Sequence, residues 1–222
     1  MVADKTLINP HRTLMPEIVV VAAHPQLEHS RVTRRLLEAA AGVAPGRIEI
    51  RQLYKRYPDY LIDIPAEQAA LAAAKLVVWL HPIHWYSMPP LMKLWLDDVF
   101  AFGWAYGPGG EALRGKDLWL VASTGGAEAS YRPDGNNRYF FENFLHPYEQ
   151  TAALTAMRWL PPMALHGALR ASDAAIAAHA DIFAQRLASY PDWPELAEME
   201  PQVECAVPAD ERPVESDGLP AL

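Results

Sequence analysis

Residues 76 to 100 constrain the fold more than any other stretch of this sequence. The segment opens with Leu-Val-Val-Trp-Leu (76–80), an apolar run that is too short for a helix and predicts a buried parallel strand. Pro89 and Pro90 then stand where the first turn of a helix tolerates residues without an N–H group, and apolar residues follow at helical spacing. The segment therefore predicts a strand, a loop over residues 82–87 and a helix.

The same unit recurs along the chain. Apolar or alternating runs predict strands at residues 17–23, 47–53, 76–80, 116–123 and 163–166. Helical patterns occupy residues 31–42, 64–74, 89–102, 139–144, 148–159 and 172–190. This order predicts an α/β fold: a doubly wound, five-stranded parallel sheet of strand order 2-1-3-4-5 in three α/β/α layers. The loops after strands 1, 3 and 4 then converge at one edge of the sheet.

The loop after the first strand carries groups that suit a phosphate. Ser30 is a good N-cap, and the backbone N–H groups of Arg31, Val32 and Thr33 open the following helix. His24, just past the strand, adds a ring N–H. An ordinary capped helix with a hydrogen-bonded histidine explains the same residues, and the segment contains neither GxGxxG nor GxxxxGK[ST].

The loop after the third strand suits a flat aromatic ligand. Ile83, His84, Trp85 and Tyr86 offer rings for packing and N–H groups for the heteroatoms of a planar heterocycle. The alternative is that Trp85 and Tyr86 fill space between helix and sheet. A metal site on His81 and His84 is a further alternative, although the neighbouring sequence offers no third ligand.

The loop after the fourth strand is Ser123-Thr124-Gly125-Gly126. Its glycines allow close backbone approach, and its hydroxyls and N–H groups can bind the edge of a polar ring. Taken together, the three loops supply a phosphate cradle, an aromatic shelf and a polar clamp in one crevice. That combination fits flavin mononucleotide (FMN), although the fold itself also carries other functions.

The sequence resembles the flavodoxin-like NAD(P)H:quinone oxidoreductases, and within them the ancillary subunits of glutathione-regulated potassium-efflux antiporters. The matching motifs are His24-Pro25, residues 81–110, Ser-Thr-Gly-Gly at 123–126 and Trp-Leu-Pro-Pro at 159–162. The resemblance implies tightly bound FMN, held at the three loops named above, and NADH or NADPH as electron donor. Tyr131 falls where such reductases keep an active-site tyrosine, while Asn137 replaces a histidine of the larger members.

By the same resemblance, the expected activity is two-electron, ping-pong hydride transfer to quinones. The expected assembly is a homodimer in which Trp104 or Tyr106 covers the neighbouring site. Docking on the cytoplasmic domain of a potassium-efflux antiporter is also implied, either beside catalysis or as the role of a non-catalytic regulatory subunit. A one-electron flavodoxin carrier fits less well, because the first loop lacks that family's phosphate loop and the body is not acidic.

Charge and composition set the domain boundaries. Of the formal charge of −8, the segment from Glu195 onward carries −7 and residues 1–194 carry −1. We therefore expect an N-terminal extension (1–15), one domain (16–194) and a disordered, acidic, proline-rich tail (195–222). A neutral body disfavours nucleic-acid binding. Neither a membrane span nor a secretory signal is evident, and Cys205 is the single cysteine, so we expect a cytoplasmic protein. The resemblance implies that a transporter partner could also hold it at the inner membrane.

Overall fold

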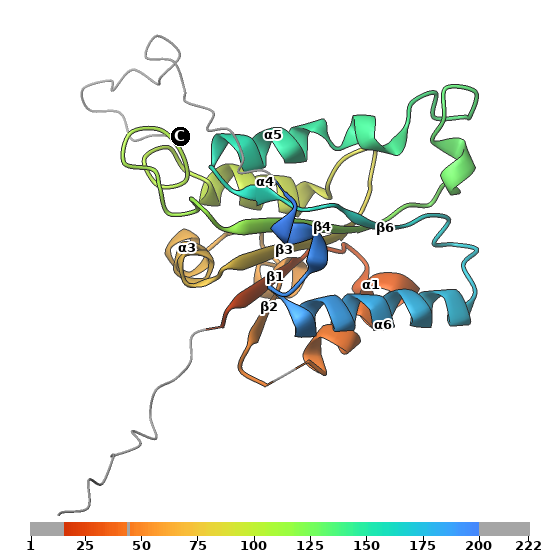
Figure 1. Ribbon diagram of the computed structural model, residues 1–222, viewed down its shortest axis with the longest axis horizontal. Helices are drawn as coiled ribbons and strands as arrows, with labels where there is room; N and C mark the ends of the chain where they lie inside the picture. The colour runs from red at the N-terminus through yellow and green to blue at the C-terminus, as the bar shows by residue number, and fades with distance from the viewer. Residues whose placement is uncertain (1–15, 44, 200–222) are drawn as a thin grey trace, which may run out of the picture.

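Six parallel strands form one sheet in the computed structural model, which describes residues 16–43 and 45–199 (Figure 1). The sheet order is β2-β1-β3-β4-β5, with β6 also pairing with β4, which confirms the predicted order 2-1-3-4-5. The strands are β1 (Ile18–Ala22), β2 (Ile48–Gln52), β3 (Leu76–Pro82), β4 (Asp117–Ser123), β5 (Arg158–Trp159) and β6 (Met163–Leu165). All pairs within the sheet are parallel.

Helices cover both faces of the sheet, as predicted for three layers (Figure 1). The α-helices are α1 (Arg31–Ala41), α2 (Leu53–Arg56), α3 (Ile64–Ala73), α4 (Pro90–Val99), α5 (His146–Leu154) and α6 (Asp173–Ser189). The described residues also form the 3₁₀ turns η1 (Leu27–His29), η2 (Glu128–Ser130), η3 (Phe141–Phe144) and η4 (Pro194–Ala197). α1 and α6 pack on one face, and α3, α4 and α5 pack on the other. No helix in the described part of the chain has the length and apolar character needed to cross a bilayer.

The central strands are buried on both faces. Along β1, Val19 and Val21 join the core under α3, α4 and α5, whereas Ile18 and Val20 join the core under α1 and α6. All five residues of β1 are buried. A strand covered on both sides has no polar face, which is why its sequence is a continuous β-branched run instead of an alternation.

The far edge of the sheet differs from the prediction. The helix expected over residues 148–159 ends at Leu154, and Arg158–Trp159 form a strand beside β4. Pro161 and Pro162 then interrupt the pairing, because proline has no N–H to donate to the ladder. Pairing with β4 resumes in β6, so two short strands occupy the predicted fifth position.

Three smaller predictions are also corrected. The segment 54–60, expected to be a loop, begins inside the one-turn helix α2. Ile182, expected on the buried side of α6, is 51% exposed, and Ala180 is buried. The ordered chain also continues past residue 194: Leu196 is buried and its carbonyl accepts a hydrogen bond from Arg158. The predicted N-terminal extension and residues 200–222 of the predicted tail lie outside the described residues.

A buried ionic cluster joins β2 to α2, α3 and α4. The side chain of Glu67 is inaccessible to solvent and accepts hydrogen bonds from Arg51 at 2.6 and 2.7 Å. The Tyr57 hydroxyl and the Trp95 indole N–H, the latter at 3.0 Å, donate to the same carboxylate. Burial, then Glu67, raises the pKa of Tyr57 to about 12. Each of these donors has the Glu67 carboxylate as its acceptor, so the cluster fixes how the helices on one face pack against the sheet.

Candidate functional site

A pocket of about 480 Å³ opens at the carboxyl edge of the sheet, where loops after β1, β3, β4 and β6 meet. Its walls include predicted residues from all three loops: His24, Ser30, Arg31, Val32, Ile83, His84, Ser123, Thr124 and Gly125. Pro82, Gln26, His29, Ala168 and Leu169 complete the lining. Four of the predicted cofactor-binding residues, Thr33, Trp85, Tyr86 and Gly126, lie outside that lining. The structure thus brings the three predicted segments together at one site.

The first wall is the beginning of α1. The Ser30 hydroxyl accepts a hydrogen bond from the Thr33 backbone N–H at 3.0 Å, which confirms the predicted N-cap. That bond occupies the N–H of Thr33. Arg31 and Val32, the first two residues of α1, have no carbonyl one turn earlier in the helix to accept from their N–H groups. These two donors, at the positive end of the helix dipole, are available to an anion.

His24 faces the same space. Its Nδ1 accepts a hydrogen bond from the Gln26 backbone N–H at 3.1 Å, so the neutral ring carries its proton on Nε2. Its ring centroid lies 6.4 Å from that of His84, across the pocket. Burial, followed by repulsion from His84, lowers the pKa of His24. The imidazole is therefore held neutral near pH 7, with one N–H to donate.

The second wall is a tight turn whose geometry the sequence did not reveal. His84 and Ser87 exchange two backbone hydrogen bonds, at 2.9 and 3.0 Å, around the central residues Trp85 and Tyr86. Both central residues have positive φ, 47° and 65° respectively. Such turns are normally built from asparagine and glycine, because the left-handed region is strained for bulky side chains. No described residue accepts a hydrogen bond from the backbone N–H of Trp85 or Tyr86.

The two aromatic side chains of this turn lie differently. Trp85 is 93% exposed, whereas Tyr86 stacks on Phe144 with centroids 5.0 Å apart and planes at 22°. Neither ring fills the space between helix and sheet, which was the alternative interpretation of this loop. Residues held in strained backbone conformations cluster at active and ligand-binding sites, so this turn is a candidate part of such a site.

The third wall is the Ser123–Gly126 loop. The Thr124 backbone N–H donates to the Leu165 carbonyl at 3.0 Å, and its hydroxyl donates to the Gly126 carbonyl at 2.7 Å. Thr124 therefore shapes the loop with its own donors. Among the residues that the structure describes, the Ser123 hydroxyl and the N–H groups of Gly125 and Gly126 have no hydrogen-bond partner.

Tyr131 lies behind this loop. It is 8% exposed and makes edge contacts with Phe141 and Phe144, at centroid distances of 5.4 and 5.9 Å. A Cβ added at Gly126 would lie 3.4 Å from ring carbon Cε2 of Tyr131, so the tyrosine ring lies directly behind that position. Tyr131 therefore backs the polar loop without lining the pocket.

The histidines proposed as an alternative metal site point to different environments. His84 lines the pocket, whereas His81 is fully buried and stacks on Tyr148, with centroids 5.7 Å apart and planes at 18°. Burial lowers the pKa of His81 to about 4. Within residues 16–43 and 45–199, no group of three or more His, Cys, Asp or Glu side chains could hold a metal ion.

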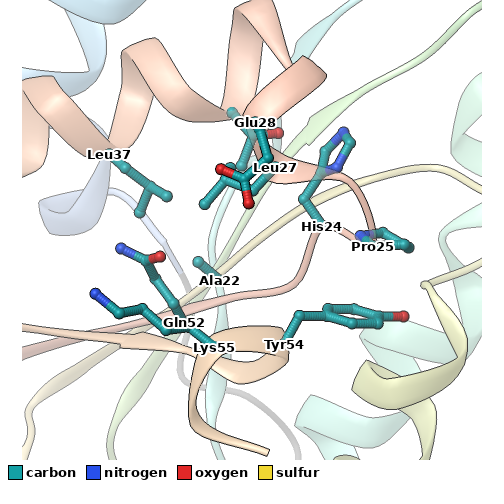
Figure 2. Close-up of a pocket in the computed structure, with 10 residues that line it drawn as sticks. Ala22, His24, Pro25, Leu27, Glu28, Leu37, Gln52, Tyr54 and Lys55 are labelled. Atoms are coloured by element: carbon teal, nitrogen blue, oxygen red, sulfur yellow. The ribbon is translucent and has the colours of Figure 1, made fainter. Parts of the chain in front are cut away.

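Two features were missed by sequence reasoning. Ala168 and Leu169 belong to the pocket because they follow β6, whose carboxyl end lies beside that of β4. A second pocket, of about 450 Å³, shares His24 with the first and is lined also by Thr33, Gln52 and Lys55 (Figure 2). Gln52 ends β2 and sits at the same sheet edge, a position that strand order alone could have indicated.

Comparison with known proteins places this architecture in a family. Residues 16–187 match the family described as having a flavodoxin-like fold. The glutathione-regulated potassium-efflux system ancillary protein KefF of Klebsiella pneumoniae is 47% identical over 178 residues, which cover 80% of this chain and 97% of that protein. The chain therefore spans nearly the whole of this relative.

Solved structures show the same fold. A Treponema denticola protein, general stress protein 14 in complex with FMN, is 34% identical with a TM-score of 0.73, covering 78% of this chain and 98% of that one. A structure named tryptophan halogenase from Streptomycin violaceusniger is 36% identical with a TM-score of 0.73, covering 76% and 97%. An NADPH-quinone reductase from P. pentosaceus is 25% identical with a TM-score of 0.69, covering 76% and 96%. The chain therefore belongs to the flavodoxin-like family that includes the ancillary proteins of glutathione-regulated potassium-efflux systems.

Proposed function

We propose that this protein is an FMN-dependent NAD(P)H:quinone oxidoreductase. The observation that carries the proposal is the set of free donors around one pocket: backbone N–H groups from all three loops, with a hydroxyl and an imidazole N–H beside them. A phosphate and the heteroatoms of a flat heterocycle need this kind of donor set. The relatives support it, since one solved structure contains FMN and another is named a quinone reductase.

Each part of the cofactor has a matching wall. The N–H groups of Arg31 and Val32, with the Ser30 hydroxyl and the His24 Nε2–H, would hold the phosphate. Thr33 supports that arrangement by closing the cap on Ser30. These donors are neutral or partial charges at a helix terminus, so no lysine is required.

The ring system would lie between the other two walls. The N–H groups of Trp85 and Tyr86, next to Ile83 and His84, would bond one edge. Ser123, Gly125 and Gly126, in the loop that Thr124 shapes, would bond the other. When bound, FMN would supply two-electron hydride chemistry, with NADH or NADPH as the donor and a quinone as the acceptor in a ping-pong cycle.

The protein's own residues would bind, orient and shield the cofactor and the substrates. Trp85 offers an exposed flat surface on which nicotinamide and quinone can pack in turn. By the resemblance, Tyr131 is the proposed catalytic residue: from behind the Ser123–Gly126 loop, outside the pocket lining, its hydroxyl would donate a hydrogen bond to negative charge that develops at the cofactor edge. The Tyr131 ring lies behind Gly126, in the loop that would hold one edge of the cofactor.

A homodimer and a transporter partner complete the proposal. Trp104 and Tyr106, expected to cover a neighbouring site, are partly buried against the core on the α4 face. Phe102, beside them, is 37% exposed and packs edge-on with Tyr106. The identity to KefF supports docking on the cytoplasmic domain of a potassium-efflux antiporter. A flavin-containing subunit whose role is regulation alone is the second candidate, favoured by that relative's description as ancillary.

The test begins with purified wild-type protein. Heat denaturation should release FMN, and the intact protein should oxidise NADPH in the presence of a benzoquinone. Release of FMN without quinone-dependent oxidation would favour the purely regulatory role. Absence of FMN binding would refute both candidates.

A matched pair of variants sharpens the test. Gly125 lines the pocket, and a Cβ built on it meets no atom within 4 Å, so Gly125→Val should fold but project methyl groups into the cofactor space. Ala129→Val, in the exposed η2 turn of the same segment, should retain FMN binding. Equal FMN affinity in the two variants would contradict the placement of the ring edge.

A further inference from the structure

His166 follows β6 and joins the Ser123–Gly126 loop through a chain of hydrogen bonds. Its Nδ1 lies 3.0 Å from the Thr124 hydroxyl oxygen, and that hydroxyl lies 2.7 Å from the Gly126 carbonyl. A hydroxyl has one hydrogen, which the Gly126 carbonyl accepts. His166 must therefore be the donor, so its proton resides on Nδ1.

The backbone around His166 is fastened to the same loop. Leu165 accepts from the Thr124 N–H at 3.0 Å, Gly167 donates to the Gly126 carbonyl at 2.8 Å, and Ala168 donates to the Thr124 carbonyl at 2.8 Å. The imidazole thus lies among the hydrogen bonds that join residues 165–168 to residues 124–126. Movement of its ring would be transmitted directly to Thr124.

The other side of the imidazole contacts aromatic rings. Its centroid lies 5.3 Å from that of Tyr131 and 4.8 Å from that of Phe141, the latter ring being perpendicular. Burial lowers the pKa of His166, while Glu128 and Glu142 oppose that shift. The ring is half-buried and touches both the polar loop and the proposed catalytic tyrosine.

We propose that His166 is a positioning residue for the flavin site. Its N–H fixes Thr124, and so aims the free N–H groups of Gly125 and Gly126 at the pocket, while its ring holds Tyr131 against the same loop. His166 itself does not line the pocket. This inference rests on the proposed function, because it concerns how the cofactor edge is held.

Two substitutions separate positioning from simple packing. His166→Asn keeps an N–H at the place of Nδ1, whereas His166→Leu keeps apolar bulk but has no donor. We expect His166→Leu to weaken FMN binding about tenfold, the effect of one net hydrogen bond, and to shift the visible absorption maximum of bound FMN. His166→Asn should bind FMN within about twofold of wild type, in line with its retained donor. Melting temperatures of the flavin-free variants report any general loss of packing.

A double-mutant cycle with Thr124→Val gives the second readout. This substitution removes both the acceptor for His166 and the donor to the Gly126 carbonyl, and it nearly preserves side-chain shape, so it should weaken FMN binding by at least about tenfold. In the Thr124→Val background, His166→Leu should cause no further loss, since the bond is already absent. If His166→Leu does not fold, Thr124→Val with His166 in place tests the hydroxyl that carries both bonds, and His166→Asn tests the donor.

The outcomes are distinct. The proposal is overturned if His166→Leu binds FMN as wild type does, if Asn and Leu weaken binding equally, or if the two sites prove additive. Failure of the wild-type protein to bind FMN would instead refute the proposed function, and this inference with it.

Discussion

The strained turn at Trp85 leads to a prediction about stability. Trp85 has φ of 47° and is 93% exposed, so its side chain contributes little packing while its backbone occupies the left-handed region. Asparagine adopts that region more readily, because its short polar side chain can hydrogen-bond locally. Trp85→Asn should therefore stabilise the flavin-free protein.

The magnitude follows from the geometry. Left-handed backbone costs an L-residue roughly 1–2 kcal/mol, and asparagine recovers about 1 kcal/mol of it. The lost packing is small, because only a small part of the Trp85 side chain is covered. For a domain of this size, about 1 kcal/mol corresponds to a rise of roughly 2–4 °C in melting temperature.

The assay is thermal and urea unfolding of flavin-free protein, with Leu61→Asn as the control. Leu61 is 75% exposed and is not among the residues with positive φ, so the control removes an exposed apolar side chain without relieving strain. We expect a higher urea midpoint at unchanged slope for Trp85→Asn and no change for Leu61→Asn. Under the proposed function, Trp85→Asn should also raise KM for the quinone.

Two results would refute this reasoning. One is a loss of stability in Trp85→Asn, and the other is a change in stability of Trp85→Asn that is no larger than the change of Leu61→Asn. The first result would mean that the indole packs on the protein in solution. The second would mean that the turn is not strained at this position.

Two further predictions concern buried charged and titratable groups. Glu67→Leu should lower the free energy of unfolding by about 3–5 kcal/mol in urea titrations, because it leaves the Arg51 guanidinium buried without its main partner. Acid should destabilise the protein through His81, whose pKa is lowered by burial to about 4, so the unfolded state binds the proton first as pH falls below 6.5. Between pH 6.5 and 4 this loss amounts to about 3 kcal/mol, and His81→Phe should flatten that part of the pH–stability curve.

The Glu67 prediction has a matched control. Glu38→Gln breaks an exposed pair with Arg35, at 3.5 Å, and should change stability by less than about 0.5 kcal/mol. If Glu67→Leu lost as little stability as Glu38→Gln, that result would contradict the claim that the buried Glu67 carboxylate is needed to pair Arg51. An unchanged acid profile in His81→Phe would show that other groups dominate the acid response.

The strand order was predictable because long buried strands have an unmistakable composition. The runs around Val20 and Val78 are continuous and β-branched, and right-handed crossovers leave few topologies for five such strands. The two-residue strand at Arg158 was not predictable, since two residues carry no periodicity. Ile182 was misplaced because α6 contains several alanines, which blur the position of its apolar face.

The site was predictable as three segments but not as a set of donors. Topology alone brings the loops after β1, β3 and β4 to one edge of the sheet. Whether an N–H is free depends on backbone geometry: Thr33 and Thr124 use theirs within the protein, while Gly125 does not. The predicted strand order already placed residues 163–166 beside the fourth strand, but the contact of His166 with Thr124 depends on side-chain geometry, which no local pattern encodes.

Titration of flavin-free protein with FMN, followed by flavin fluorescence, tests whether the three loops form a flavin site. We expect saturable binding of one FMN per chain and clearly weaker binding of riboflavin, which lacks the phosphate that Arg31, Val32 and His24 would hold. No binding of FMN, or equal affinity for FMN and riboflavin, would contradict this expectation.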